Sequence, residues 1–382
     1  MYKSLIVMLL FAITVSCHHD HLSSRFHGKS IILYIGDGMG AEQRKAAQWY
    51  AYGLDSQLAM DQLPYRGMAI TQSASNLITD SAAAATAIST GIKTNNGFIA
   101  MDPFLNVVTT ILEIARSKGM STGLITNTQL THATPAAFST HVNNRNLMNE
   151  IALQMINADI NVLLGGGEGE FLPTGSAGHY PEDGKRNDGR NLIAEAMIRG
   201  YHYIYDEQGL SAIDVNSITK LLGLFSDEDM MRPNNPSLAA MTSKAIDILK
   251  KNTNGFFLMV EGGQIDWAGH TNDAINNMMD VLEFDDAVSF GMRYLNENSN
   301  TLLVVAADHE TGGMEVTTMS SGSVDEDGPY HMPDGTQFYI KWMGTSHTGI
   351  NVPVTAGGYS SVAFSGVFDN TYIFEIMNSH IQ

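Results

Sequence analysis

Short apolar runs that stop abruptly at Asp, Glu or His are the feature that most constrains the fold of this chain. The runs are rich in β-branched residues and occupy residues 31–35, 122–126, 256–260, 301–307 and 352–356. Runs of this length and composition are typical of strands buried in a sheet. The predicted strands are spread over almost the whole length of the chain.

Helical patterns lie between these strands, the clearest at residues 107–118, 147–158 and 280–295. Alternating strands and helices predict an α/β fold with a large, mostly parallel central sheet flanked by helices on both faces. Such sheets bind their ligands at the carboxyl ends of the strands. We therefore expect polar residues remote in sequence to meet at one edge, among them Asp37, Glu261, Asp266, Asp308 and His309.

Taken singly, several of these residues have ordinary structural explanations. Asp37 lies between two glycines, as a turn former or a helix cap often does. Asp266 and His270 are four residues apart, which lets both face one ion on a helix but is common without an ion. His347 alone would be an ordinary loop histidine.

Taken together, carboxylates and imidazoles at several strand ends predict a multinuclear metal site. The adjacent pair Asp308 and His309 ends a strand although neither residue type favours one, and capping does not explain the pair. Zinc accepts Asp and His ligands, whereas magnesium prefers oxygens such as those of Asp37, Thr134 and Glu261.

The stretch ITDSAAAATAISTG, residues 78–91, places Asp80 and Ser81 at the start of a run of small residues with high helix propensity. A helix N-terminus favours an anion because of its free N–H groups and its dipole. Four consecutive alanines bury little surface, so they indicate a slim helix that fits close to a crowded site.

The first residues predict an export signal. Lys3 is the only early charge, residues 5–15 are apolar, and this run is too short to span a membrane as a helix. We expect residues 1–16 to be a signal peptide, either an ordinary one or a lipoprotein signal that leaves a lipid-anchored Cys17 as the mature N-terminus. Residues 17–27, with their histidine-rich start, are expected to form a solvated tether. Cys17 is the only cysteine, so the mature chain holds no internal disulfide.

The excess of acidic over basic side chains excludes some classes of function. The chain has 40 Asp and Glu against 21 Lys and Arg, a formal net charge of −19. Nucleic-acid binding needs a basic face that displaces counterions, so the sequence predicts no nucleic-acid-binding face. An anionic substrate would be repelled at long range, and local positive charge would have to come from bound ions.

Six motifs, in this order, resemble the alkaline phosphatase family: IGDGMG, TDSAAAATA, HATPAA, EGGQIDWAGH, ADHETGG and HTG, spanning residues 35–349. The resemblance implies an enzyme that hydrolyses phosphate monoesters by two-zinc in-line displacement through a phosphoserine intermediate at Ser81, releasing inorganic phosphate. It also implies two Zn²⁺ and one Mg²⁺ per subunit and a homodimer without a transmembrane helix in the mature protein. The location implied is the bacterial periplasm, free or as a membrane-anchored lipoprotein.

The resemblance also assigns roles to individual residues. Ser81 matches the nucleophile, Arg145 the phosphate clamp and Asp80 the acid that orients this arginine. The implied ligands are Asp266, His270 and His347 for the first zinc, Asp37, Ser81, Asp308 and His309 for the second, and Asp37, Thr134 and Glu261 for magnesium.

Two positions depart from the best-known bacterial pattern of the family. His132 stands where that pattern has Asp, and Trp267 stands where it has Lys. Both positions belong to the outer shell that reaches magnesium and phosphate through water. Because an imidazole replaces a carboxylate, we hypothesise weaker magnesium retention and faster product release.

No Pro-rich or Ser-rich linker divides the chain, so we expect one domain over residues 28–382 with insertions at about 165–236 and 314–345. Larger family members carry a crown-like domain in the second insertion, which we expect to be reduced here to a loop. The first insertion contains the basic cluster Lys185, Arg186 and Arg190, for which a solvated face or a substrate contact are the alternatives.

Other functions remain open at this point. A phosphodiesterase or a sulfatase of the same superfamily is the nearest alternative. Arg145 favours monoesters over diesters, and the alanines after Ser81 do not fit the C/S-x-P-x-R motif of sulfatases. From another class, a catalytically silent surface protein that binds metal or phosphate would keep the same ligands.

Overall fold

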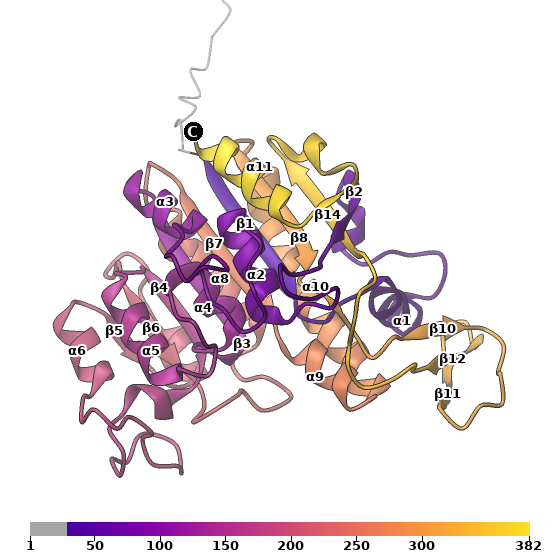
Figure 1. Cartoon of the computed structure of the whole chain (residues 1–382), viewed down its shortest axis with the longest axis horizontal. Helices are drawn as coiled ribbons and strands as arrows, with labels where there is room; N and C mark the ends of the chain where they lie inside the picture. The colour runs from indigo at the N-terminus through magenta and orange to yellow at the C-terminus, as the bar shows by residue number, and fades with distance from the viewer. Residues whose placement is uncertain (1–28) are drawn as a thin grey trace, which may run out of the picture.

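The computed structural model describes residues 29–382, and its centre is a ten-stranded sheet (Figure 1). The predicted signal peptide and tether lie outside the described residues. The strand order is β15-β2-β14-β8-β1-β7-β3-β4-β6-β5, in which β14 runs antiparallel to both neighbours and all other pairs are parallel. The strands are β1 (Ser30–Gly36), β2 (Tyr65–Ile70), β3 (Ser121–Gln129), β4 (Val162–Gly166), β5 (His202–Ile204), β6 (Leu221–Leu224), β7 (Phe256–Gly262), β8 (Thr301–Ala307), β14 (Val352–Gly358) and β15 (Gly366–Asp369).

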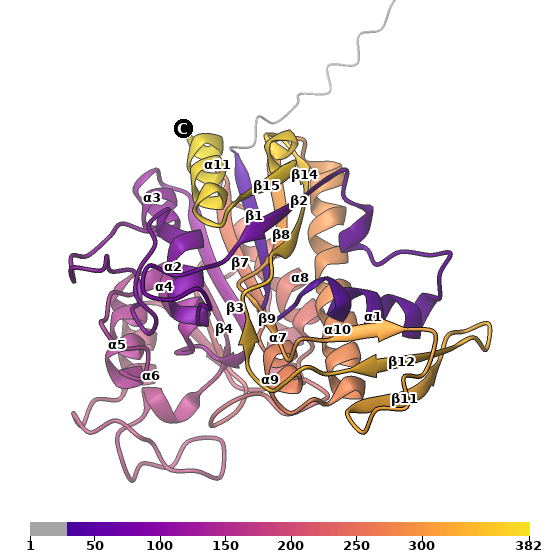
Figure 2. The ribbon, with the colours of Figure 1, turned by 45° about the vertical axis from the view of Figure 1, so that its right-hand side comes forward.

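Helices cover both faces of this sheet (Figure 2). Helices α2, α3, α4 and α11 lie on one face, and α8 and α10 lie on the other. The α/β fold predicted from the sequence is therefore confirmed. The helices are α1 (Ala41–Tyr52), α2 (Ser81–Thr90), α3 (Ile111–Ser117), α4 (Ala133–Ser139), α5 (Met148–Asn157), α6 (Leu192–Ile198), α7 (Glu207–Ala212), α8 (Leu238–Leu249), α9 (Gln264–His270), α10 (Ala274–Glu297) and α11 (Thr371–Ile381), with 3-10 turns at Met60–Gln62, Glu168–Phe171 and Ser361–Phe364.

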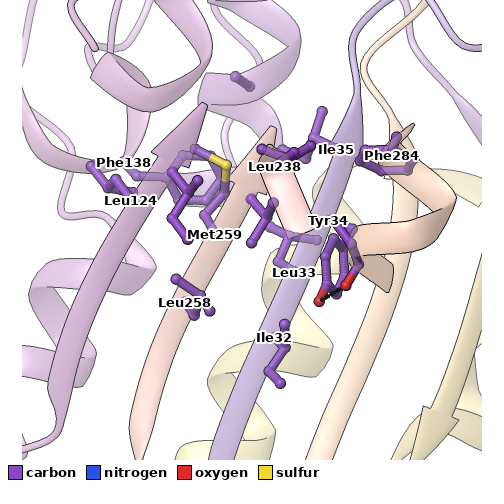
Figure 3. Packing of buried hydrophobic residues seen from close by; sticks show 14 of the residues in the cluster. Ile32, Leu33, Tyr34, Ile35, Leu124, Phe138, Leu238, Leu258, Met259 and Phe284 are labelled. Carbon is purple, nitrogen blue, oxygen red and sulfur yellow. Dashed lines mark hydrogen bonds between the residues drawn. The ribbon is translucent and has the colours of Figure 1, made fainter. Parts of the chain in front are cut away.

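The central strands are buried on both faces, which explains their uninterrupted apolar sequence (Figure 3). On one face, the Tyr34 ring of β1 packs edge-on against Phe284 of α10 at 6.0 Å, and its hydroxyl donates to the Ala287 carbonyl. On the other face, Phe257 of β7 stacks on Phe138 of α4 at 5.8 Å. The sheet is thus held between two helical layers.

All five predicted strand runs lie within observed strands, namely β1, β3, β7, β8 and β14. The predicted helices are also present, with different ends. The run at 107–118 becomes helical only at Ile111, because Thr110 and Glu113 form a capping box there. The run at 280–295 is the middle of α10, which begins after its N-cap Asp273.

The prediction that the 314–345 segment is reduced to a loop is wrong. It contains an antiparallel sheet in the order β10-β12-β11, formed by Glu315–Thr317, Gln337–Lys341 and Glu326–His331. Phe338 and Ile340 of β12 are buried, and the Phe338 ring lies edge-on to Trp49 of α1 at 5.9 Å. These apolar residues give the segment one face to bury, which a polar loop lacks.

The 165–236 insertion extends the main sheet, because β6 pairs with β4 and β5 pairs with β6. Across residues 29–382, no helix has both the length and the apolar character needed to cross a bilayer.

Candidate metal centre

Three neighbouring strands bring predicted ligands to one edge of the sheet. β1 lies between β8 and β7, with Gly36 level with Ala307 and Gly262. Asp37 and Asp308 follow β1 and β8 directly, and Glu261 is next to last in β7. The carboxylates therefore meet because the strands are parallel and in register.

Two further segments reach the same edge. Helix α9 follows β7 and carries Asp266 and His270 one turn apart. His347 lies in β13 (His347–Thr348), just before β14. Because β14 is antiparallel to β8, its first residue lies where β8 ends, so His347 arrives beside Asp308 and His309.

Asp37, Asp308 and His309 form the first group of side chains that could hold a metal ion. His309 Nε2 lies 3.4 Å from Asp37 Oδ1 and 3.3 Å from Asp308 Oδ2, and all three side chains are fully buried. Ser81 Oγ lies 3.4 Å from the same His309 nitrogen. The group predicted for the second zinc is thus assembled around one point.

Asp266, His270 and His347 form a second group. His270 Nε2 lies 3.2 Å from both Asp266 Oδ2 and His347 Nε2, and His347 Nε2 lies 3.5 Å from Asp266 Oδ1. His309 also lies close enough to share this site with Asp266 and His347. These are the residues predicted for the first zinc.

Backbone carbonyls orient the two histidines of this group. His270 Nδ1 lies 2.6 Å from the Thr345 oxygen, and His347 Nδ1 lies 3.0 Å from the Thr79 oxygen. A carbonyl only accepts, so Nδ1 carries the proton and Nε2 is left free to ligate. No sequence pattern predicts these contacts, because any residue can supply a carbonyl.

Asp37, His132 and Glu261 form the third group, close to Thr134 at the start of α4. His132 Nδ1 lies 3.9 Å from Glu261 Oε1, and its Nε2 lies 3.2 Å from Arg145 Nη2. Because the guanidinium only donates, His132 Nε2 accepts and the ring proton is on Nδ1. A protonated nitrogen does not ligate, so this geometry favours His132 as an outer-shell residue and the oxygens of Asp37, Thr134 and Glu261 as ligands.

Ser81 is the first residue of α2, and Asp80 is its N-cap. Asp80 Oδ1 accepts from the Ala83 N–H at 2.9 Å, and Oδ2 accepts from Arg145 Nη1 at 3.2 Å. The cap and the orienter of Arg145 are therefore the same carboxylate. Every residue of α2 is buried, so the run of alanines allows the helix to pack closely beneath the site.

Burial changes the acid-base properties of this edge. Burial, and then the carboxylates of Asp308, Asp266 and Glu261, raise the pKa of Asp37 well above its usual range. Burial and the neighbouring Asp266 raise the pKa of Asp308 to about 7. Burial lowers the pKa of His309 to about 4, which favours the neutral imidazole that a metal requires. Bound dications would stabilise this concentration of carboxylates.

Unpartnered polar atoms test whether the residues fit metal ions. Buried polar atoms without a hydrogen-bond partner are rare in folded proteins. Several lie at this edge: both carboxylate oxygens of Asp37, Thr134 Oγ1, Glu261 Oε1, Asp308 Oδ2 and the Nδ1 of His132. Five of these six atoms are oxygens of the predicted metal-ligand residues, so the donor set fits cations.

The basic residues of the first insertion form ion pairs away from the candidate metal centre. Arg186 is buried, pairs with Asp188 and donates to two carbonyls, those of Asn149 and Glu170. Lys185 pairs with Glu228, and Arg190 with Glu195. A solvated face is thus wrong for Arg186, because its guanidinium is buried and is bonded to Asp188 and to two carbonyls.

A model of the alkaline phosphatase family matches residues 28–334. This chain belongs to the alkaline phosphatase family. Alkaline phosphatase 3 of Bacillus subtilis (strain 168) is 34% identical over 422 residues, covering 90% of this chain and 87% of that protein. The family membership predicted from six motifs is therefore confirmed, and with it the class of phosphomonoester-hydrolysing enzymes.

A solved alkaline phosphatase from the Antarctic bacterium TAB5 has the same architecture. Its TM-score is 0.80 at 30% identity, covering 93% of this chain and 98% of that chain. A variant of the TAB5 enzyme with a histidine changed to aspartate has Mg bound in its M3 site, and matches with a TM-score of 0.78 at 30% identity over the same shares of both chains. Members of the alkaline phosphatase family are thus similar to this chain in fold as well as in sequence.

Proposed function

We propose that this chain hydrolyses phosphate monoesters with Ser81 Oγ as the nucleophile. In the first step Oγ attacks phosphorus, the ester P–O bond breaks and the alcohol leaves. Water then attacks phosphoserine 81 and releases inorganic phosphate. The observation that carries the proposal is the buried Ser81 hydroxyl at the start of α2, 3.4 Å from His309 Nε2 and beside the carboxylates of the metal centre.

The proposed cofactors are two Zn²⁺ and one Mg²⁺ per subunit. The mixed nitrogen and oxygen donors suit zinc, and the all-oxygen donors suit magnesium. Bound dications would favour the Ser81 alkoxide and stabilise charge on the leaving oxygen. The zinc ligands would be Asp266, His270 and His347 at one site and Asp37, Asp308 and His309 at the other, with Asp37, Thr134 and Glu261 holding magnesium.

Arg145 is the proposed phosphate clamp. Its guanidinium is held between Asp80 and His132, with 3.2 Å to each, and its side chain remains 23% exposed. A guanidinium fixed in this way can donate two parallel hydrogen bonds to equatorial phosphate oxygens, where charge spreads in the transition state. The positive end of the α2 dipole acts on the same anion.

The molecule is also proposed to be exported and homodimeric. The apolar run at residues 5–15 supports export to the bacterial periplasm, with Cys17 as the lipid anchor in the lipoprotein form. Family resemblance supports the dimer. Mass spectrometry of the mature N-terminus and light scattering of the purified protein test these two statements.

Activity tests separate the proposal from its alternatives. We expect Ser81→Ala to lose about 10³-fold or more in kcat on 4-nitrophenyl phosphate. Ser89→Ala is the matched control, because Ser89 lies in the same buried helix and bonds only to the Thr86 and Ala137 carbonyls. Full activity of Ser81→Ala would contradict the role of Ser81 as the nucleophile. If the wild type hydrolyses bis(4-nitrophenyl) phosphate faster than 4-nitrophenyl phosphate, the protein is a phosphodiesterase.

A further inference from the structure

Glu310 is a buried carboxylate between two histidine-bearing segments. It follows His309 directly and pairs with Thr348 across the short ladder of β9 (Glu310–Thr311) and β13, so His347 is opposite Thr311. Its exposed fraction is 1%. Glu310 lies in the ADHETGG motif but is not among the predicted site residues.

Four hydrogen-bond donors contact the Glu310 carboxylate. Oε1 accepts from Gln43 Nε2 at 2.7 Å and from the Met314 N–H at 3.1 Å. Oε2 accepts from the Gly313 N–H at 3.2 Å and from the Thr348 hydroxyl. Within the described residues none of these partners is a basic side chain. A carboxylate accepts at both oxygens, so it satisfies all four donors at once.

The neighbours of Glu310 are arranged around this group. Gln43 of α1 also donates from Nε2 to the Thr311 carbonyl at 2.9 Å, while its own Oε1 has no partner. The orientation of this amide is therefore set by the acceptors on the β9 segment. Gly40 leaves room for the Glu310 side chain, because a Cβ at position 40 would lie 2.4 Å from the Glu310 Cγ.

These bonds connect the segments that carry His309 and His347, which belong to the two predicted zinc groups. The Thr348 bond fixes the residue after His347, and the Gln43 bonds fix the residues after His309. Thr311, held in the same ladder, donates from Oγ1 to Asp266 Oδ1. One carboxylate thus connects α1, β9 and β13 directly behind three predicted zinc ligands.

We infer that Glu310 is a positioning residue that sets the zinc affinity of the two predicted zinc groups, the one with His309 and the one with His347. It contacts no substrate and acts through the segments of His309 and His347. The inference rests on the proposed metal assignment and is independent of whether Ser81 is the nucleophile. Outer-shell partners of metal ligands commonly change affinity by about 10- to 100-fold when removed.

Glu310→Gln tests this directly. The glutamine has nearly the same shape, but its NH₂ group would face N–H or O–H donors. We expect zinc affinity, measured by competition with a chromogenic chelator in the absence of substrate, to fall by about 10- to 100-fold. Thr348→Val removes one donor without altering Glu310 and should weaken zinc binding in the same direction by a smaller factor.

Glu168→Gln is the matched control. Glu168 is also 1% exposed and accepts from the His179 and Tyr180 N–H groups and the Tyr203 hydroxyl, none of them a predicted site residue. This variant should lose thermal stability but bind zinc like the wild type.

Wild-type zinc affinity in both Glu310→Gln and Thr348→Val would overturn the inference, as would an equal loss of affinity in Glu168→Gln. If Glu310→Gln fails to fold, Thr348→Val decides by the same measurement. A wild type that binds zinc but does not hydrolyse monoesters would contradict the proposed function and leave this inference standing.

Discussion

Asp80 uses its two carboxylate oxygens for different partners. Oδ1 caps α2 at Ala83, while Oδ2 accepts from Arg145 and from the Gly97 N–H. Asparagine caps a helix nearly as well as aspartate but offers Arg145 no charge. We expect Asp80→Asn to lower the free energy of unfolding by no more than about 1 kcal/mol and to weaken inhibition by inorganic phosphate roughly tenfold. Urea denaturation and the phosphate inhibition constant check this, and an unchanged inhibition constant would contradict it.

His132 and Trp267 are the two residues that depart from the best-known bacterial pattern of the family. The two rings meet edge to face at 6.3 Å, and His132 also accepts from Arg145. Replacing them by the carboxylate and ammonium of the common bacterial pattern should tighten magnesium retention, because a carboxylate attracts the hydrated ion more strongly than a neutral imidazole. We expect His132→Asp/Trp267→Lys to retain magnesium longer during dialysis and to turn over more slowly. Unchanged magnesium affinity and turnover would refute the hypothesis.

His141 provides a pH-dependent prediction. Burial lowers the pKa of this imidazole, but its bonds to Glu113 (3.1 Å) and to the Ala100 carbonyl (2.9 Å) outweigh burial, so the pKa is raised above 6.5. A raised histidine pKa stabilises the fold below the unfolded value and ceases to do so as pH rises through the folded value. His141→Gln should therefore lose more stability relative to wild type at pH 6 than at pH 9. Equal losses in urea denaturation at both pH values would argue against the ion pair.

At the element scale, the apolar runs predicted the central strands well because β1, β7 and β8 are buried on both faces and contain almost no polar residues. The direction of β14 was not predictable, since pairing depends on contacts remote in sequence. Strand β2, which lies between β15 and β14, was not predicted because Ala69 is its only fully buried residue. The 314–345 sheet did carry a signal, the apolar alternation of Phe338 and Ile340.

Helix α2 is expected not to accommodate a larger side chain. Ala85 is fully buried in a helix that packs against α4 and α11, so a larger side chain has no free space. We expect Ala85→Leu to cost about 1–3 kcal/mol of unfolding free energy and to lower activity, because a displaced helix moves Ser81. Ala194→Leu, at an exposed position of α6, should change stability by no more than about 0.5 kcal/mol. Equal changes in unfolding free energy for the two substitutions would show that α2 accommodates a larger side chain and would contradict this prediction.

At the scale of the whole molecule, the sequence indicated which residues converge, since parallel strands share one carboxyl edge. It did not indicate how they are supported: Thr79 and Glu310 lie inside two of the six motifs, but no pattern predicts that the carbonyls of Thr79 and Thr345 and the carboxylate of Glu310 hold the site in place. The net charge of −19 applies to the surface as a whole, whereas substrate attraction depends on cations held at this edge. The activity of this protein is therefore expected to depend on the metal centre.

Metal depletion followed by measured re-addition tests whether activity depends on the metal centre. The protein is stripped by exhaustive chelation, its zinc and magnesium contents are determined, and hydrolysis of 4-nitrophenyl phosphate is followed as each ion is returned. We predict loss of activity on depletion, recovery with up to two zinc ions per subunit, and a further increase with magnesium. If protein shown to be metal-free is fully active, the metal centre is not needed for hydrolysis. The same conclusion follows if zinc restores no activity while the fold is intact.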